Sequence, residues 1–529
     1  MKGSEGLKKK FSTHVFLSLF YGALTGALTG FTVFFFKLLA KKAEGFSRAI
    51  YSFAEGNLLY IAVLFILLTL LAVATYFLHK RIPEAKGGGI PRTEGILKGA
   101  LFFRHIRTLV GTVTGSMISF IAGIGVGSEG PSVLIGTALG KVSATRIKNR
   151  HAWQRYIMSS GASAGFAVAT GAPLSAVLFS LEEVHKRFTP LLIMTVSSAV
   201  ATASFINELL SSAMGAGVSL FEIASLKALS LRDIGYVFLL AVITSLFVTL
   251  FDCTIELMSR LRKKRNFKTP PLVKLVLLFL SSGVFAIYAS DAVYSGHLVI
   301  ERVLEKSYTL LPLVALLVIR LAFLIFVTRS DATGGIFIPS LAIGALISGV
   351  TAEVFIMLGM PSDLFATITL LGTCSFIGGM MRSPVMASVF FVELTGQFSS
   401  FLFVIVATFI SGAIIEFFDK KNFYDRVTEK MEREQNKDKT PEIKTFEVAV
   451  AENSFVADKM VRDIMWPSSA VVVSVYRDGK EVSFYENLAD VRLLSGDTIR
   501  VRVQVLDEDD VRGDLADLVG FGGIINCKK

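Results

Sequence analysis

The chain has 529 residues, of which 52% are hydrophobic and 18% are charged, and its formal net charge is +11 at pH 7. A soluble enzyme of this length would rarely be so apolar. The three cysteines show no CxxC or metal-ligand spacing, so they predict neither a disulfide framework nor a zinc site. No nucleophile–base pair or metal motif indicates catalysis, and we expect no enzymatic activity and no resident cofactor.

Long apolar stretches recur along the chain, and several reach the roughly 20 residues that a helix needs to cross a bilayer. Others are shorter or are broken by Gly and Pro. The pattern predicts an all-α, multi-pass membrane protein with discontinuous helices. The first stretch lacks a small-residue cleavage site, so we expect it to remain as a helix. The stretches are Val15–Leu39, Leu58–Leu78, Ile157–Ala172, Leu191–Leu210, Ile234–Phe251, Leu275–Ala289, Leu310–Val327, Thr367–Gly379 and Phe401–Phe418.

Basic residues cluster beside the apolar stretches, at Lys8–Lys10, Arg262–Arg265 and Lys420-Lys421. The positive-inside rule places all three clusters on the cytoplasmic face, and with them both termini. Nucleic acid binding is the competing interpretation of such clusters. Because they flank membrane spans, we expect a lipid bilayer as the partner and no nucleic acid.

Glu129 lies in the segment Gly127-Ser128-Glu129-Gly130-Pro131, between two apolar runs. A carboxylate at membrane depth is costly unless it has a partner, and it marks an ion or proton pathway. The flanking Gly and Pro predict that Glu129 begins a helix. Free N–H groups and the helix dipole favour negative charge at such a position. The segment therefore predicts coupled movement of an anion and a proton.

The membrane region contains an internal duplication. Gly127–Gly136 resembles Gly335–Gly344 with a proline-to-proline offset of 208, and Ala172–Phe179 resembles Ser383–Phe390 with an offset of 211. Two ordered matches at nearly one offset predict repeats at about 12–215 and 230–434, although chance similarity between apolar segments is the alternative. In transporters, such repeats place the substrate site at their interface, built by the ends of half-helices.

Three further elements accompany Glu129. Gly87–Pro91 is a Gly-rich turn that enters a short helix, so its amides can approach an anion closely. Gly335–Pro339 is the repeat partner of the Glu129 segment, and Tyr424 carries a hydroxyl that can donate to an anion. Taken singly, a triple Gly is more often a flexible loop, and such a Tyr is more often an interfacial anchor.

The segments GSEGP, GGGIP and GIFIP, in this order, match the GxEGP, GSGIP and GxFxP motifs of the CLC family of chloride channels and chloride/proton antiporters. The chain resembles that family, of the prokaryotic type, over about residues 12–434. The resemblance implies two inverted-topology repeats with broken helices, a homodimer with a separate pore in each subunit, and a location in a bacterial cell membrane.

The resemblance also implies a role for each matching residue. Glu129 corresponds to the external gating glutamate, whose carboxylate mimics an anion and is released outward when it is protonated. Chloride is then held by backbone amides and one hydroxyl. The expected anion ligands are Ile336, Phe337 and Tyr424 at a central site, Gly130 and Ile338 at an outer site, and Gly87 and Gly88 at an inner site.

Gly88 departs from the family pattern, which commonly has a Ser at this position. The change removes one hydrogen bond to the central anion, worth about 1.5–3 kcal/mol, although water can substitute for it. Chloride remains the expected ion. A preference for nitrate or another anion, and a neutral variation at Gly88, both stay open.

Glu183 follows Glu182 at the end of an apolar helix. By the resemblance, it matches the internal proton-transfer glutamate that antiporters usually carry. The alternative is a solvated carboxylate at a helix end, facing Lys186 or Arg187. Three functions stay open: an anion/proton antiporter, a passive voltage- or ligand-gated anion channel, and an unrelated inverted-repeat transporter for an organic anion.

A small α+β domain is predicted at residues 446–505, after a membrane domain at 1–434 and a polar linker at 435–445. About sixty residues are marginal for independent folding, so we expect this domain to pair with a second copy. The tail at 506–529 has no predicted role. The expected elements are strands at Phe446–Val450, Ala470–Tyr476, Val482–Tyr485 and Thr498–Val505, and a helix at Phe455–Ile464.

This domain resembles the RCK C-terminal (TrkA-C-like) domain of potassium-transport regulators. The matching segments are Pro467–Ser469, Val471–Gly479 and Leu493–Asp497. Such domains dimerise, and some in bacteria bind cyclic di-AMP between protomers. By this analogy Arg477 and Arg500 are candidate phosphate ligands of a cytosolic regulatory site. A dimerisation domain without a ligand is the alternative.

Overall fold

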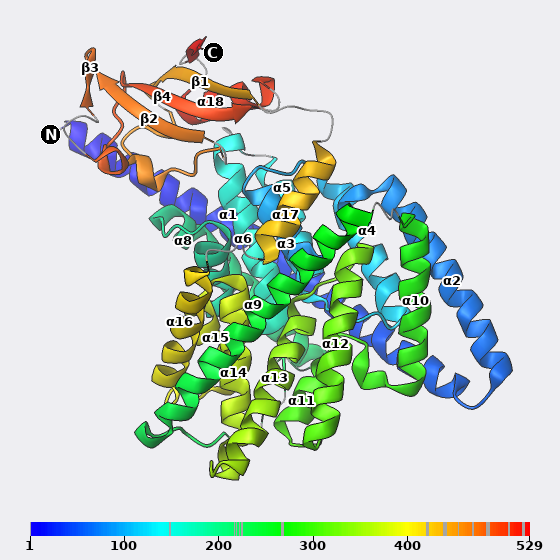
Figure 1. Cartoon of the computed structure of the whole chain (residues 1–529). Coiled ribbons are helices and arrows are strands. Elements are labelled where there is room, and N and C mark those ends of the chain that lie inside the picture. Colours follow the sequence, from blue (N-terminus) through cyan, green and yellow to red (C-terminus); the bar gives the residue numbers. More distant parts are fainter. Residues whose placement is uncertain are drawn as a thin grey trace.

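The computed structural model shows a helical bundle with a small sheet domain at one end (Figure 1). The N-terminal end of α1 and the sheet domain lie at the same end of the bundle (Figure 1). The structure describes residues 2–528 except 146, 148–149, 216, 218–219, 222, 224–225, 266–268, 419–422, 437–441, 453, 468–469, 483–486, 506–507 and 521–523.

The first half of the bundle contains long helices together with short, interrupted ones. A wide helical turn at Phe179–Val184 continues directly from α7. The helices are α1 (Lys2–Ala54), α2 (Leu58–Arg81), α3 (Gly89–Leu97), α4 (His105–Ile121), α5 (Glu129–Ala144), α6 (Arg150–Thr170), α7 (Pro173–Leu178) and α8 (Pro190–Met214).

The second half repeats this alternation. Its helices are α9 (Ile234–Arg265), α10 (Pro271–Tyr288), α11 (His297–Leu304), α12 (Leu310–Ser330), α13 (Phe337–Met357), α14 (Phe365–Met381), α15 (Pro384–Thr395), α16 (Phe401–Phe417) and α17 (Phe423–Gln435). Helices α5 and α13 begin 208 positions apart, and α7 and α15 begin 211 apart, which are the two offsets of the sequence repeat.

Within the described residues, 8 helices are long and apolar enough to cross a membrane. The prediction of a multi-pass helical membrane protein with short, broken helices is therefore confirmed. Of the predicted cytoplasmic clusters, Lys420-Lys421 lies outside the described residues, and the side chains of Lys8–Lys10 and Arg262–Arg265 are not described.

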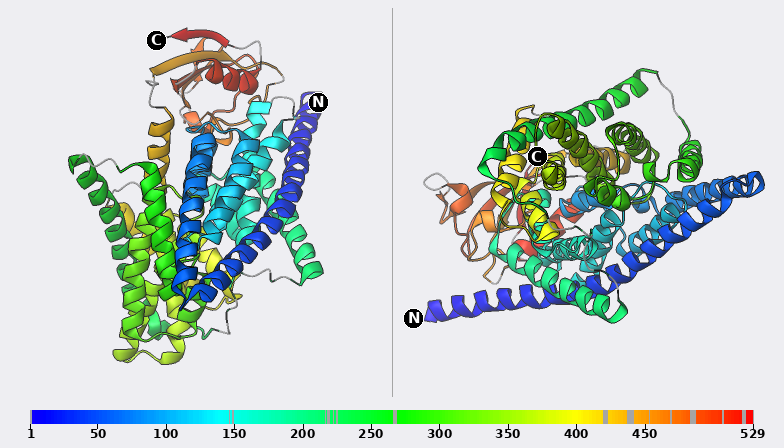
Figure 2. Two further views of the ribbon diagram at one scale, coloured as in Figure 1. Left: turned by 90° about the vertical axis from the view of Figure 1, so that its right-hand side faces the viewer. Right: turned by 90° about the horizontal axis from the view of Figure 1, so that it is seen from below.

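Helix α1 crosses the bundle as a long oblique rod (Figure 2). Small residues on α1 let it pack directly on the backbone of α8. A Cβ at Gly26 would lie 2.2 Å from the Ala199 carbonyl oxygen, and one at Gly22 would lie 2.6 Å from that of Thr195. Such close packing of small residues is the usual source of helix association in a bilayer, where apolar burial gives little driving force.

The C-terminal domain is an antiparallel sheet of five strands in the order β3-β2-β4-β1-β5. Alternating burial along β4 directs one face of the sheet toward the domain core. The elements are β1 (Glu442–Ala449), β2 (Ala470–Arg477), β3 (Lys480–Glu481), β4 (Thr498–Val505), α18 (Glu508–Val519) and β5 (Ile524–Lys528).

The structure differs from the predicted elements of this domain in two places. Phe455–Ile464 contains only a short 3₁₀ turn at Val461–Asp463, because its backbone amides bond across the domain: Val456 to Leu518 and Asp458 to Leu493. The sheet also extends past 446–505, since β1 begins within the predicted linker and β5 comes from the tail. Of the strand predicted at Val482–Tyr485, residues 483–485 lie outside the described residues.

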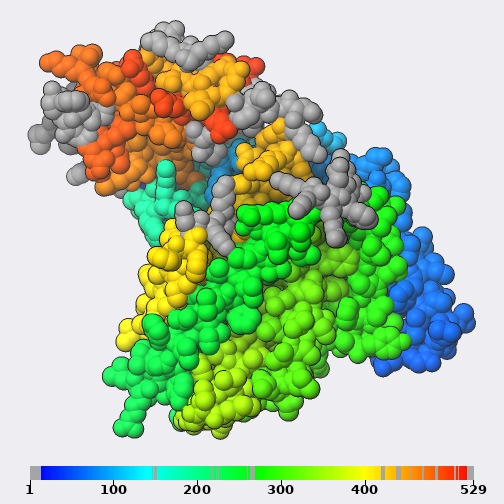
Figure 3. Space-filling model, viewed as in Figure 1, coloured from blue at the N-terminus to red at the C-terminus, as the bar shows by residue number. Residues whose placement is uncertain are grey.

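The sheet domain covers one end of the bundle (Figure 3) and packs against α6. The Tyr156 hydroxyl accepts a hydrogen bond from the Met465 amide at 3.1 Å and donates to the Asp463 carbonyl at 3.2 Å. Arg155 donates to the Trp466 carbonyl and approaches Asp514 of α18 at 3.4 Å. These bonds connect the domain directly to a helix of the membrane region.

Candidate anion and proton site

Three glycine-rich helix starts meet inside the bundle with their backbones in contact. A Cβ at Gly89 would lie 1.9 Å from the Gly130 carbonyl oxygen, and one at Gly130 would lie 2.8 Å from the Gly335 Cα. Real Cβ atoms do not come this close, so no residue other than glycine fits these positions without backbone movement. Helices α3 and α5 and the segment that leads into α13 therefore converge on one point.

The two repeat segments are also joined by hydrogen bonds. The Gly127 amide donates to the Gly335 carbonyl at 2.7 Å, and the Gly335 amide donates back to the Gly127 carbonyl at 2.8 Å. The pairing brings together residues 208 positions apart. It places the starts of α5 and α13 side by side, and the sequence repeat predicts a substrate site at this interface.

Glu129 is the first residue of α5 and is 0% exposed. Its Oε1 accepts a hydrogen bond from the Ser128 hydroxyl at 3.1 Å. Its Oε2 has no hydrogen-bond partner among the described residues and turns back over Gly127, where a Cβ would lie 2.3 Å from it. A buried carboxylate with an unsatisfied oxygen at a helix start is suited to alternate between charged and protonated forms.

Aromatic rings fix the start of α13. The Phe337 ring is fully buried and meets the rings of Phe166 on α6 and Phe390 on α15 edge-on, at centroid distances of 5.3 Å and 5.9 Å. Phe166 in turn stacks on Phe179 at 5.1 Å. The rigid cluster holds the backbone of Ile336 and Phe337, whose amides are the predicted central ligands.

Tyr424, the second residue of α17, is 0% exposed. Helix α17 packs on α3, where the Thr428 hydroxyl donates to the Pro91 carbonyl at 2.8 Å. Tyr424 lies within electrostatic range of Glu183 and Glu94. Its full burial fits an internal position and not an anchor at the membrane surface.

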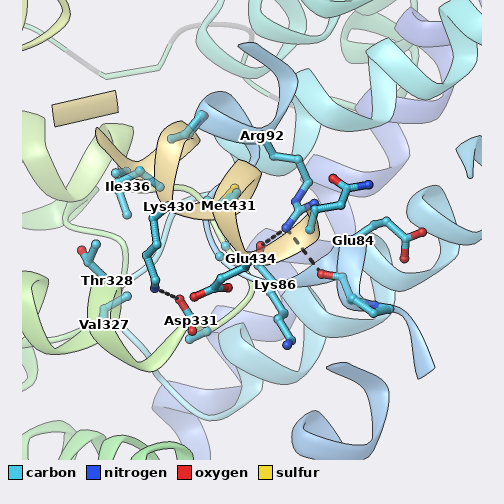
Figure 4. A pocket seen from close by; sticks show the side chains of 18 of the residues that line it. Glu84, Lys86, Arg92, Val327, Thr328, Asp331, Ile336, Lys430, Met431 and Glu434 are labelled. Atoms are coloured by element: carbon cyan, nitrogen blue, oxygen red, sulfur yellow. Dashed lines mark hydrogen bonds and ion pairs between the residues drawn. The ribbon is translucent and has the colours of Figure 1, made fainter. Parts of the chain in front are cut away.

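A cavity of about 450 Å³ lies between α3, α12 and α17 (Figure 4). Gly87, Gly88 and Ile336 line it, and all three are predicted anion ligands. The charged lining residues are Glu84, Lys86, Arg92, Arg104, Asp331, Lys430 and Glu434. Lys430 pairs with Asp331 at 2.8 Å across the cavity, so its mouth is polar and of mixed charge.

The cavity has room beside Gly88. A Cβ there would lie 3.7 Å from its nearest neighbours, the Gly334 carbonyl oxygen and Pro91 Cδ, which is ordinary van der Waals contact. The backbone at Gly88 has φ −74° and ψ 141°, which any residue adopts. Unlike Gly89 and Gly130, Gly88 is therefore not required by packing.

Glu183 is 2% exposed, and its Oε2 accepts a hydrogen bond from the Ser383 hydroxyl at 2.7 Å. A carboxylate this buried does not fit the alternative of a solvated helix end. Glu94, also 2% exposed, interacts electrostatically with Glu183 and forms an ion pair with Lys98, which approaches Asp425 at 3.3 Å. Sequence analysis did not single out Glu94, which lies in the helix that follows the Gly-rich turn.

Sequence analysis also missed His297, whose Nε2 lies 3.7 Å from Oε1 of Glu129. No spacing or motif marks a single histidine on a distant helix. Only the folded arrangement of α5 and α11 brings the two residues together.

Arg477 and Arg500 lie in the sheet domain, apart from the membrane site. Arg477 forms two hydrogen bonds with Asp497, both 2.8 Å long, and a third with the Arg492 carbonyl. Arg500 donates to Glu447 at 2.7 Å, and this bond raises the pKa of its guanidinium. A phosphate ligand would have to compete with these carboxylates, and the phosphate-binding role stays a prediction.

Comparison with known proteins identifies the family of the membrane region. The family model described as "Voltage gated chloride channel" matches residues 70–416. The chain belongs to this family. The prediction of a transport protein rather than an enzyme is thereby confirmed, whereas the matched range stops before the sheet domain and leaves its RCK_C identity a prediction.

Curated relatives of the chain include H(+)/Cl(-) exchange transporters named ClcA. That of Vibrio cholerae serotype O1 (strain ATCC 39541 / Classical Ogawa 395 / O395) is 29% identical over 418 residues, which cover 77% of this chain and 86% of the relative. That of Salmonella schwarzengrund (strain CVM19633) is 27% identical, with 77% and 87% coverage.

Solved structures share the fold of this family member. A slow cyanobacterial Cl-/H+ antiporter matches with a TM-score of 0.72 and 22% identity, covering 79% of this chain and 99% of the other. A CLC-type fluoride/proton antiporter matches with a TM-score of 0.62 and 18% identity, covering 76% and 95%. At these identities the matches confirm the CLC fold of the membrane domain.

Proposed function

We propose that the chain moves chloride across a membrane in exchange for protons. The observation that carries this proposal is the buried Glu129 carboxylate at the first residue of α5, where glycine-packed segments of both repeats meet. The printed names of the ClcA relatives, which are H(+)/Cl(-) exchange transporters, support it. At the central site, anions would be held by the amides of Ile336 and Phe337 and by the Tyr424 hydroxyl. The outer site would use Gly130 and Ile338, and the inner site, beside the cavity, would use Gly87 and Gly88.

Exchange follows from competition for one position. A charged Glu129 carboxylate is attracted to the same positive helix ends as a chloride ion. Protonation removes that charge, so the side chain leaves and an anion takes its place. Each proton that binds Glu129 thereby opens the pathway to an anion, which couples the two fluxes.

A second protonatable group serves the other side of the membrane. Glu183 is buried and interacts electrostatically with Glu94, which pairs with Lys98. Lys98 also approaches Asp425, and both of these side chains are partly exposed. The anion cavity instead runs beside Gly88 and Ile336. Protons and anions would therefore share the region of Glu129 and separate toward the end that carries the sheet domain.

The test uses the full chain in liposomes loaded with chloride, with chloride and proton fluxes recorded together. We expect proton uptake to accompany chloride efflux, and Glu129→Gln to abolish the proton flux while anion flux continues. Glu55→Gln, at an exposed residue after α1, is the matched control. Chloride efflux without protons in the unmodified protein would instead establish a passive channel.

A second candidate function, transport of another anion, is favoured by the open space at Gly88. Residue 88 contributes no hydroxyl there, and the space beside it can admit an ion larger than chloride. Flux measured with nitrate or fluoride in place of chloride decides between these substrates. Faster nitrate than chloride transport would overturn chloride as the main substrate.

We further propose that the sheet domain regulates transport as an RCK_C-like module that binds cyclic di-AMP. Its contact with Tyr156 on α6 supports this, because Phe166 on the same helix packs against Phe337. Adding cyclic di-AMP to the reconstituted full chain should change the exchange rate. An unchanged rate and flat calorimetric titration heats would dismiss the ligand.

We also propose a homodimer in the bacterial cell membrane, with both termini in the cytoplasm. The N-terminal end of α1 and the sheet domain lie at the same end of the bundle, which supports placing both termini on the same side of the membrane (Figure 1). Analytical ultracentrifugation in detergent tests the dimer. Labelling of a cysteine introduced in the exposed turn at Gly479 in intact cells tests the orientation, and we expect it to remain unlabelled by an impermeant reagent.

A further inference from the structure

His297 is the first residue of α11 and lies between the buried Glu129 and solvent. Its side chain is 29% exposed, whereas that of Glu129 is 1% exposed, and the distance from Nε2 to Glu129 Oε1 is 3.7 Å. Gly296, in the left-handed region with φ 104°, turns the chain immediately before it. In Figure 1, α11 lies toward the end of the bundle away from the sheet domain.

Hydrogen bonds determine which ring nitrogen of His297 carries the proton. The Ser295 hydroxyl donates to Oε2 of Glu44 at 3.0 Å, and Oε1 of Glu44 pairs with Arg48 at 2.8 Å. A hydroxyl has one hydrogen, so Ser295 must accept from Nδ1–H of His297, 3.0 Å away. In the tautomer that this bond selects, the lone pair of Nε2 faces Glu129.

Further charged and aromatic groups surround the imidazole and its buried partner. Lys37 interacts electrostatically with Glu129. Arg320 of α12 is adjacent, since a Cβ at Gly296 would lie 2.9 Å from its Nη1, and it donates to the Asp291 and Val293 carbonyls. The Phe221 ring packs against the imidazole with centroids 5.7 Å apart.

We propose that His297 relays protons between solvent and Glu129 on the side of the membrane opposite the sheet domain. A proton from hydronium binds the Nε2 lone pair and leaves water behind, while Nδ1–H stays bonded to Ser295. A rotation that shortens the 3.7 Å gap to about 2.8 Å lets the same proton pass to Oε1 of Glu129. The products are a neutral carboxylic acid and the original neutral tautomer, so the relay needs no resetting.

This relay rests on the proposed role of Glu129, and it predicts a different defect from loss of Glu129 itself. Slow proton delivery should slow chloride and proton fluxes together and keep their ratio, whereas Glu129→Gln should break the ratio.

The experiment measures exchange in liposomes by full chains oriented so that protons are supplied on the His297 side. We expect His297→Ala to slow both fluxes about 100-fold, the low end of what a positioned acid–base group contributes. Free imidazole at millimolar concentration should restore exchange in His297→Ala. His105→Gln, at the first residue of α4, is the histidine control and should exchange normally.

The outcomes separate the two proposals. Unchanged proton coupling in Glu129→Gln would overturn the exchange mechanism, whatever happens at His297. A normal rate in His297→Ala, with Glu129→Gln uncoupled, would overturn the relay alone. Slow exchange that imidazole does not restore would also overturn it, because a structural role of the side chain predicts that result.

Discussion

Glu182 and Glu393 occupy matching positions in the two repeats, and each carboxylate caps a helix of the opposite repeat. Glu182 accepts from the Val385 and Met386 amides at the start of α15, at 3.0 Å and 2.7 Å. Glu393 accepts from the Leu174 and Ser175 amides at the start of α7, at 2.6 Å and 2.8 Å. The positions are 211 apart, as are the prolines that begin the two helices. This reciprocal capping connects the two repeats. It also bonds backbone amides that the starts of the short helices would otherwise leave without a partner.

Removing one of these caps should destabilise the protein. Glu393→Ala loses the two amide bonds and the bond from the Ser175 hydroxyl at 2.6 Å. Losing an N-terminal cap costs about 1–2 kcal/mol of unfolding free energy. We expect a lower unfolding temperature in detergent for Glu393→Ala and Glu182→Ala, a smaller decrease for Glu393→Gln, and none for Glu55→Gln. Equal stability of all four variants would contradict the capping role.

The convergence of glycine backbones should not tolerate a single methyl group. Gly89→Ala would place a Cβ 1.9 Å from the Gly130 carbonyl oxygen, so α3 and α5 must separate. Overpacking of this kind costs about 1–3 kcal/mol and here also displaces the predicted anion ligands. We expect loss of transport with a reduced unfolding temperature. Gly45→Ala, with no neighbour within 4 Å of its Cβ in α1, is the matched control and should behave normally.

Much of this arrangement could be predicted from the sequence, because it is encoded in local motifs. The starts of α5 at Glu129 and of α3 at Gly89 follow from Gly and Pro at helix boundaries, and the repeat offset predicted that α5 and α13 are equivalent. Local patterns also gave β2 and β4 their bounds to within one residue.

Residues that act through long-range contacts could not be predicted in this way. His297 and Glu94 carry no motif, and their roles depend on which helices pack together. The helix predicted at Phe455–Ile464 is absent because tertiary bonds to other segments replaced its own. The tail had no apparent pattern because β5 is defined only by its pairing with β1.

Glu183 should matter for protons and not for anions. In the unmodified chain the Ser383 hydroxyl donates to Glu183 at 2.7 Å, and the amide oxygen of Glu183→Gln can still accept this bond. The amide cannot bind and release a proton at neutral pH as a carboxylate can. We expect proton flux to fall about 100-fold, while chloride flux persists in liposomes with a pH electrode. Ser383→Ala is the companion variant and should leave proton flux within a few-fold of normal. A fully coupled Glu183→Gln would exclude this carboxylate from the pathway.

Restoring a hydroxyl at position 88 should strengthen chloride binding. Gly88→Ser fits, since its Cβ would be 3.7 Å from the nearest atoms, and its hydroxyl would add one hydrogen bond to the anion. Such a bond is worth about 1.5–3 kcal/mol, which corresponds to an affinity increase of about 10- to 100-fold. Calorimetric titration with chloride measures it. Gly88→Ala fills the same space without a donor, so an equal gain in both variants would refute the hydrogen bond as the cause.

Tyr156 should determine how firmly the sheet domain is attached to the membrane region. Tyr156→Phe keeps the buried ring but removes the bonds to the Met465 amide and the Asp463 carbonyl. Leaving these two groups without a partner costs about 1–3 kcal/mol each if they stay buried, so the contact should open more often. We expect faster hydrogen exchange at the Met465 amide in the full chain, and a weaker transport response to any ligand of the sheet domain.

Tyr288→Phe changes an exposed tyrosine at the end of α10 and serves as the control. If exchange at Met465 is the same in both variants, the hydroxyl contributes nothing to docking, and coupling between the domain and Phe337 would have to run through Arg155 instead.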